Sequence, residues 1–141
     1  MNFLELLKHK KEIYKNFKKV ISPALSSEVF FNSKGFNHIT FKNNRNPRTV
    51  GDQINRLNII DIAYELIKHS NTYQEYEKVN LVDGKIKEYW GIIAIYKNTK
   101  IKVILRKIGN GNIHFWSVIP AHTTSEKRDG NFKMKGNVDN D

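Results

Sequence analysis

The sequence predicts one α+β domain, in which N-terminal helices pack on one face of an antiparallel β-sheet. Two observations carry this prediction: helical periodicity is concentrated before residue 70, and β-prone runs joined by turn residues continue to residue 120. A length of 141 residues suits a single compact unit. We therefore expect one domain over residues 1–120. The polar stretch 121–141 has no apolar period and is expected to be a disordered tail.

The first 50 residues predict one helix and two short β-prone runs. Apolar residues recur at three- and four-residue spacing from Phe3 to Ile21, with lysines on the opposite side, and Ser22-Pro23 ends this amphipathic helix. Glu28–Phe31 and His38–Lys42 predict two strands, or a strand and a loop, on either side of a turn. Asn43–Gly51 shows no period and is expected to be a basic loop.

The rest of the domain predicts a second helix and a β-meander. The helix begins at Asp52, which is expected to be its N-cap, and runs to about Lys68 with a clear apolar face. A polar stretch follows. The meander is expected to contain the strands Lys87–Tyr96, Lys100–Lys107 and Asn112–Ile119, with turns at Asn98-Thr99 and Asn110-Gly111.

The Asn110-Gly111 turn predicts which side chains share a sheet face. A two-residue type I′ loop there pairs Arg106 with Phe115 and Ile104 with Ser117. Because side chains alternate along a strand, Arg106 and Ser117 then point to the same face. An arginine and a hydroxyl would thus lie close together at one end of the meander.

The same register has two further consequences. Lys107 and His114 would share the opposite face, and a two-residue turn at Asn98-Thr99 would place Gly91 opposite Arg106, leaving space for a ligand phosphate. A three-residue loop over Gly109-Asn110-Gly111 would instead shift the pairing by one residue and put Arg106 beside His114. Both registers remain open at the level of sequence.

Charge suggests a polyanionic partner. The formal net charge is +10, and it lies in the first 120 residues because acidic and basic residues cancel in residues 121–141. Lysine and arginine contacts to phosphates release condensed counterions and give affinity without sequence preference. The alternative is compositional bias in a chain rich in Lys, Asn and Ile, although such a bias should enrich Glu as readily as Lys.

The absence of cysteine excludes disulfides, thiolate zinc sites and a cysteine nucleophile, and favours a reducing setting. Lysines interrupt the apolar residues of Met1 to Val20, unlike a signal peptide or membrane span. A basic amphipathic helix can lie on a membrane, but its apolar stripe is also what a core-facing helix needs. We expect a cytoplasmic protein with no membrane partner, unless the chain is the excised tail of a larger exported protein.

Several short motifs carry a resemblance to a known group of proteins. Gly35-Phe36-Asn37-His38-Ile39 precedes the second helix, and Tyr89-Trp90, Val103–Lys107 and His114–Pro120 follow it. In this order they resemble the phage-associated barnase/EndoU/colicin/RelE-like nucleases over roughly residues 25 to 120. The resemblance implies N-terminal helices packed on a four-stranded antiparallel sheet. It also implies a metal-independent ribonuclease that acts as a toxin or effector.

The resemblance also assigns candidate catalytic residues. His38 matches the histidine that follows the first strand, Arg106 the cation of the penultimate strand, and Ser117 the hydroxyl of the last; Lys107 is a weaker match. RNA cleavage without a metal needs a base for the 2′-hydroxyl, an acid for the leaving 5′-oxygen and cations for the phosphorane charge. We expect His38 to serve as base or acid, Arg106 to grip the scissile phosphate, and Ser117 to hydrogen-bond a phosphate oxygen.

Substrate binding is expected from Lys107 or Arg48 along the flanking backbone, and from Phe115 against a base. No metal or cofactor is expected, because no paired carboxylates accompany the histidines of the meander. The partner is RNA, with DNA as the alternative.

Two non-catalytic functions remain open. One is an RNA- or DNA-binding module in which Phe115, Trp116 and Tyr89 stack on bases while lysines follow the backbone. The other is a partner-binding phage or mobile-element protein whose basic face meets an acidic inhibitor, which is also how a toxin would meet its antitoxin.

Overall fold

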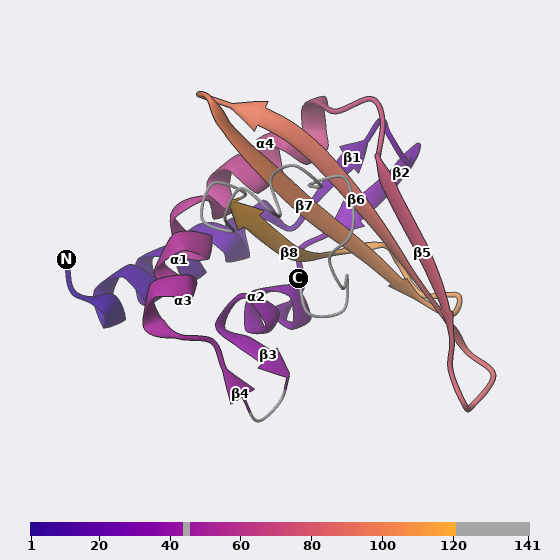
Figure 1. The fold of residues 1–141 in the computed structure, drawn as a ribbon, viewed down its shortest axis with the longest axis horizontal. Helices are drawn as coiled ribbons and strands as arrows, with labels where there is room; N and C mark the ends of the chain where they lie inside the picture. The colour runs from indigo at the N-terminus through magenta and orange to yellow at the C-terminus, as the bar shows by residue number, and fades with distance from the viewer. Residues whose placement is uncertain (44–45, 121–141) are drawn as a thin grey trace.

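The computed structural model describes residues 1–43 and 46–120, which form helices and a mixed β-sheet (Figure 1). The helices are α1 (Phe3–Phe17), α2 (Ser33–Thr40), α3 (Val50–Asn58) and α4 (Ile60–His69). The strands are β1 (Lys19–Ser22), β2 (Ser27–Phe30), β3 (Phe41–Asn43), β4 (Asn46–Pro47), β5 (Glu75–Asn80), β6 (Ile86–Tyr96), β7 (Thr99–Ile108) and β8 (His114–Pro120). The tail predicted for residues 121–141 lies outside the described residues.

The fold is α+β, but the predicted four-stranded antiparallel sheet is wrong. The main sheet has six strands in the order β1-β2-β8-β7-β6-β5, and β3 and β4 form a separate two-stranded sheet. Strands β5 to β8 are antiparallel neighbours, whereas β2 runs parallel to β8 and pairs with it at Phe30 and His114. The β1–β2 hairpin therefore makes the sheet both wider and mixed.

The β1–β2 hairpin exists because the first helix ends earlier than its apolar spacing predicts. Helix α1 begins at a capping box, in which the Asn2 side chain accepts from the Glu5 N–H at 2.8 Å, and ends at Phe17. Lys18 then adopts a positive φ of 56°, which turns the chain out of the helix. Ile21, which continues the helical spacing, is an exposed residue of β1.

Helix α2 replaces the turn predicted after Phe31 and the first three residues of the strand predicted for His38–Lys42, whereas Phe41 and Lys42 belong to β3. The Asn32 side chain accepts a hydrogen bond from the Gly35 N–H at 3.2 Å and caps the helix. Phe36 and Ile39 are buried in the core, and Figure 1 shows α2 beside β8. Tertiary packing of this apolar face thus outweighs the β propensity of the segment that follows Asn37.

Gly35 is the position at which α2 meets β8. A Cβ at this residue would overlap the carbonyl oxygen of Phe115 and would lie 2.9 Å from the Tyr14 hydroxyl. The obstacle is partly backbone, so it cannot move aside by a rotamer change. Only glycine lets α2 approach the strand this closely.

We expect Gly35→Ala to lower the free energy of unfolding by about 1–3 kcal/mol, because the added methyl overpacks a fixed contact. Urea unfolding followed by circular dichroism measures the change. Gly51→Ala is the matched control: this helical glycine has nothing within 4 Å of its Cβ position, so the substitution should be neutral or slightly stabilising. Equal stability of Gly35→Ala and the control would contradict the close approach.

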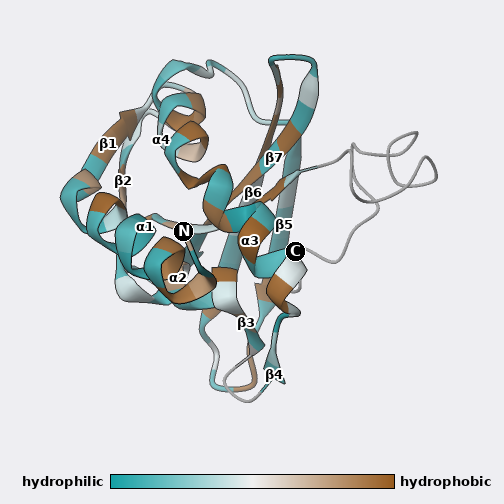
Figure 2. Ribbon diagram, turned by 90° about the vertical axis from the view of Figure 1, so that its left-hand side faces the viewer, coloured by the Kyte–Doolittle hydropathy of each residue, from teal (hydrophilic) through white to brown (hydrophobic). Residues whose placement is uncertain are grey.

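The predicted second helix is two helices. The side chain of Thr49, not of Asp52, accepts the capping hydrogen bond, from the Asp52 N–H at 3.1 Å. Helix α3 ends at Asn58, Ile59 leaves the helical conformation, and α4 begins at Ile60. The helices contribute to one hydrophobic core with one face of the main sheet, and hydrophobic and hydrophilic residues alternate along them in Figure 2. The core includes Tyr14, Phe36, Leu57, Ile67, Trp90, Leu105 and Phe115.

The β6–β7 turn is shifted by one residue from its predicted place. Lys97 and Asn98, both with positive φ, form the two-residue turn, so Tyr89 lies opposite Arg106. Gly91 lies opposite Ile104 instead, and its Cβ position is 2.8 Å from the Glu75 carboxylate. The prediction that Gly91 leaves space for a phosphate is therefore wrong. Strand β5 fills this space, and it is formed by a stretch that the sequence predicts only to be polar.

The β7–β8 hairpin contains a bulge that joins both predicted registers. Ile104 lies opposite Ser117, as the two-residue loop predicts, whereas Arg106 lies opposite His114, as the three-residue loop predicts. The pairing shifts between Ile104 and Leu105, where β8 has one extra residue, Trp116. The predicted pairing of Arg106 with Phe115 is therefore wrong. The prediction that His114 lies on the face opposite to Arg106 is wrong as well. Arg106, His114 and Ser117 lie along one face.

None of the helices within residues 1–43 and 46–120 is long and apolar enough to cross a membrane.

Candidate active site

The candidate site forms around Trp116, the residue of the β8 bulge. The His38 imidazole from α2 stacks on the indole, with ring centroids 4.0 Å apart and an interplanar angle of 13°. The Arg106 guanidinium from β7 lies over the same indole, 3.4 Å from the ring centroid, in a cation–π contact. His114 meets Trp116 edge-on at 6.2 Å. One aromatic ring thus brings together a helix and two strands.

Arg48 fixes the position of His38. Its Nε donates to the His38 carbonyl oxygen at 2.8 Å, and its Nη2 lies 3.1 Å from His38 Nε2. Its backbone is held as well, because the N–H donates to the Thr40 carbonyl at 2.8 Å and the carbonyl accepts from the Gln53 amide at 2.8 Å. Arg48 and His38 are both buried. A residue predicted in an open basic loop is thus a fixed, buried part of the site.

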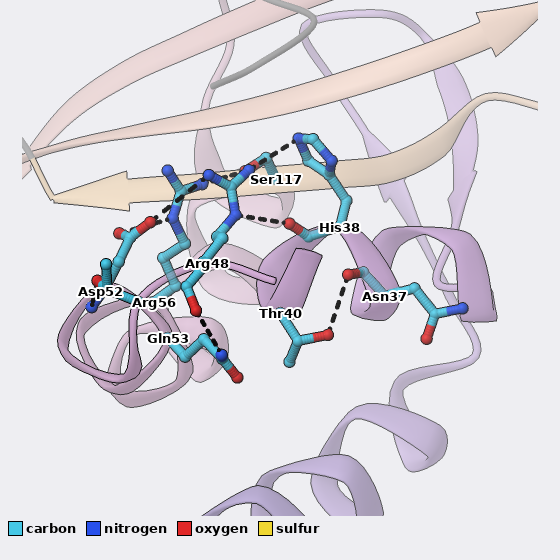
Figure 3. Close-up of polar contacts among 9 residues, drawn as sticks. Asn37, His38, Thr40, Arg48, Asp52, Gln53, Arg56 and Ser117 are labelled. Carbon is cyan, nitrogen blue, oxygen red and sulfur yellow. Dashed lines mark hydrogen bonds and ion pairs between the residues drawn. The ribbon is translucent and has the colours of Figure 1, made fainter. Parts of the chain in front are cut away.

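Asp52 and Arg56 extend the cluster to Ser117. The Asp52 carboxylate pairs with Arg48 Nη1 at 3.5 Å and with Arg56 Nε at 3.0 Å. Arg56 Nη1 donates to the Ser117 hydroxyl at 2.7 Å, and Ser117 is fully buried. Figure 3 shows Asp52 on one side of the two guanidiniums and the His38 ring on the other. Helix α3 supplies both Asp52 and Arg56, one turn apart, so it connects β8 to α2.

Burial and positive charge keep both histidines neutral. Burial is the main cause that lowers the pKa of His38 to about 3, and the guanidiniums of Arg48, Arg56 and Arg106 lower it further. The pKa of His114 falls to about 4, again chiefly through burial, with further lowering from Arg106 and Lys34 against a raising hydrogen bond to the Asn112 carbonyl. Both imidazoles are therefore uncharged at neutral pH.

The chemistry of this cluster is that of an oxyanion-binding site with two potential proton carriers. Guanidiniums present forked N–H donors that match phosphate oxygens, and a neutral imidazole can accept a proton. The Trp116 Nε1–H is a further buried donor that has no acceptor among the described residues. Within that same part of the chain, no group of three or more His, Cys, Asp or Glu side chains is arranged to hold a metal ion.

The structure places the six predicted site residues in three different settings. His38, Arg106 and Ser117 meet around Trp116, and Arg48 joins them. Lys107 lies opposite Glu88, and strand alternation points it away from the face that carries Arg106. Phe115 is fully buried in the core and stacks on Phe31 with centroids 5.6 Å apart, so its ring is not accessible to a nucleobase.

Sequence reasoning missed Asp52 as an ion-pair partner, Arg56 and the central position of Trp116. A signal for Arg56 was present: Gln53 and Arg56 occupy the same helical face as Leu57 and Ile60, and all four are buried. Polar side chains within an apolar stripe need buried partners. The position of Trp116 had no such signal, because it depends on the bulge.

Comparison of the chain with protein-family models, with curated proteins and with solved structures gave no significant match.

Proposed function

We propose that the cluster around Trp116 is the active site of a metal-independent endoribonuclease, which cleaves RNA by attack of the 2′-hydroxyl on the adjacent phosphorus. The supporting observation is the convergence of two histidines, three arginines and a serine on one short segment of β8. These are the groups that the reaction needs, and the net charge of +10 favours a polyanionic substrate.

The reaction divides between the two histidines. One neutral imidazole removes the 2′-hydroxyl proton as the 2′-oxygen bonds to phosphorus. The other imidazole, which must first be protonated, supplies a proton to the 5′-oxygen as its bond to phosphorus breaks. The products are a 2′,3′-cyclic phosphate and a free 5′-hydroxyl. His38 and His114 take these two roles because both lie against Trp116, one stacked on it and one at its edge.

The arginines and the serine stabilise the phosphorane. Arg106 lies on the same sheet face as Ser117 and is held over Trp116, so its forked donors can meet two phosphate oxygens. Arg56 orients the Ser117 hydroxyl through the 2.7 Å hydrogen bond. A hydroxyl can accept one hydrogen bond and donate another, so in the proposed mechanism Ser117 accepts from Arg56 and donates to a phosphate oxygen.

Incubation of the purified full chain with total RNA in excess EDTA tests the proposal. We expect cleavage that leaves 2′,3′-cyclic phosphate ends, and loss of about a hundredfold or more in rate for His38→Ala and for His114→Ala. His69→Ala is the matched control, since this exposed histidine of α4 pairs with Glu65 on its own helix. Intact RNA that still shifts on a gel would instead support the non-catalytic binding module.

A further inference from the structure

Each of the two histidines is held by an arginine through the same ring nitrogen. Arg48 Nη2 lies 3.1 Å from His38 Nε2, and Arg106 Nε donates to His114 Nε2 at 3.0 Å. A guanidinium has only donors and stays protonated in proteins. Both Nε2 atoms must therefore be acceptors, which places the single proton of each neutral ring on Nδ1 and leaves the basic nitrogen of each ring occupied.

This arrangement opposes proton transfer at the site. A proton on Nε2 of His38 would meet the Arg48 donor directly, with Arg56 of α3 and Arg106 of β7 adding positive charge. A proton on His114 would meet Arg106 of β7 and the field of Lys34 in α2. The Asp52 carboxylate pairs with Arg48 and Arg56 in this network. In the free protein, therefore, neither ring takes up a second proton near neutral pH.

A phosphodiester competes for the same guanidinium donors. It carries a negative charge and accepts forked hydrogen bonds, which are shorter and stronger than a bond from guanidinium to a neutral nitrogen. Its charge also offsets the positive potential at the two rings. The ligand that binds the arginines is therefore the one that frees the histidines.

We propose that the substrate phosphate activates the site, because Arg48 and Arg106 transfer their N–H donors from the two Nε2 atoms to phosphate oxygens. His38 and His114 are then free to exchange protons. In this arrangement Arg48 holds His38 before the substrate arrives and then binds the phosphate. The inference rests on the proposed function and adds that the free protein is held inactive until RNA binds.

Nitrogen-detected NMR of the histidine side chains tests this in the full chain. Spectra between pH 5 and 8 report the tautomer and the pKa of each ring in three samples: the protein alone, with inorganic phosphate, and with a 2′-O-methyl RNA oligonucleotide that cannot be cleaved. Alone, His38 and His114 should remain Nδ1–H tautomers over the whole range. With the oligonucleotide both pKa values should rise by about 1–3 units, because a negative charge adjoins each ring.

Matched controls tie the effect to individual contacts. The signal of the exposed His69, which pairs with Glu65 on α4, should not move when RNA is added. Arg106→Gln should raise the pKa of His114, its hydrogen-bond partner, by more than that of His38. Because this comparison is made within one folded variant, a fold check by its amide spectrum suffices.

The outcomes separate this inference from the nuclease proposal. If the oligonucleotide binds while both rings stay neutral Nδ1–H tautomers, activation by phosphate is wrong even if RNA is cleaved. If the pKa values rise but wild-type protein cleaves no RNA, the inference holds and the nuclease proposal fails. Ordinary titration of either ring in the free protein, or failure of both phosphate and oligonucleotide to bind at millimolar concentration, would overturn the inference.

Discussion

Replacing Arg106 by alanine should lower the rate of RNA cleavage by about a hundredfold to a thousandfold, the loss typical when a donor to transition-state charge is removed. The Arg106 guanidinium contacts both Trp116 and His114. In the proposed mechanism, the substitution removes a phosphate ligand and the hydrogen-bond partner of His114 together. Single-turnover cleavage of a defined RNA in EDTA measures the change.

Two further variants show whether the effect belongs to the guanidinium. Arg106→Lys keeps the charge but not the planar fork, so it should recover less than a tenth of the lost rate. Lys107→Ala removes a neighbouring cation of the same strand that points to the other face, and should change the rate less than threefold. Circular dichroism must show folded protein for each variant. Equal losses for Arg106→Ala and Lys107→Ala would indicate general electrostatic attraction instead of a site.

The free energy of unfolding should fall by roughly 3 kcal/mol between pH 6.5 and pH 5 as two histidines take up protons only in the unfolded chain. In the folded protein the pKa values of His38 and His114 are lowered to about 3 and about 4, below the ordinary value near 6.5. The unfolded state therefore binds more protons throughout this window. Proton binding therefore stabilises the unfolded state relative to the native state as the pH falls. The full free energy of unfolding is recovered only above pH 6.5.

Urea unfolding at intervals of half a pH unit measures this dependence. The window lies above the ordinary carboxylate pKa values, so aspartate and glutamate contribute little to it. His38→Gln and His114→Gln should each reduce the pH dependence by about half, whatever they do to stability at pH 7. A flat profile between pH 6.5 and pH 5 in the wild-type protein would show that the folded imidazoles titrate normally.

The sequence predicted the residues that meet at the site better than it predicted the elements that carry them. From the sequence, His38 is predicted to lie in a strand or a loop, because the residues that follow it favour a strand. It lies instead in α2, because Asn32 caps the helix and Gly35 permits contact with β8. Neither feature can be recognised from the segment alone. The Asn32 cap requires the residues after it to be helical, and the need for glycine at position 35 arises only from contact with β8.

The hairpin that carries the other predicted residues shows a different limit. Turn chemistry gave two registers, and each is correct on one side of Trp116. A bulge is chosen by packing on both faces of the sheet, here Phe115 inward and His38 against the indole, and no local pattern encodes it. Strand β5 was missed for a simpler reason: its residues Glu75–Asn80 are mostly charged or polar because it is an edge strand.

The stacking of Trp116 on His38 gives the protein an internal optical reporter. Indole emission is quenched by a protonated imidazole in contact with the ring, and responds to a cation held over its face. Trp116 has the His38 imidazole and the Arg106 guanidinium as its neighbours. The other tryptophan, Trp90, packs in the hydrophobic core, with its ring centroid 5.7 Å from that of Tyr76. Fluorescence of a Trp90→Phe protein therefore reports the charge and position of His38 and Arg106 directly, without a label and on the timescale of mixing.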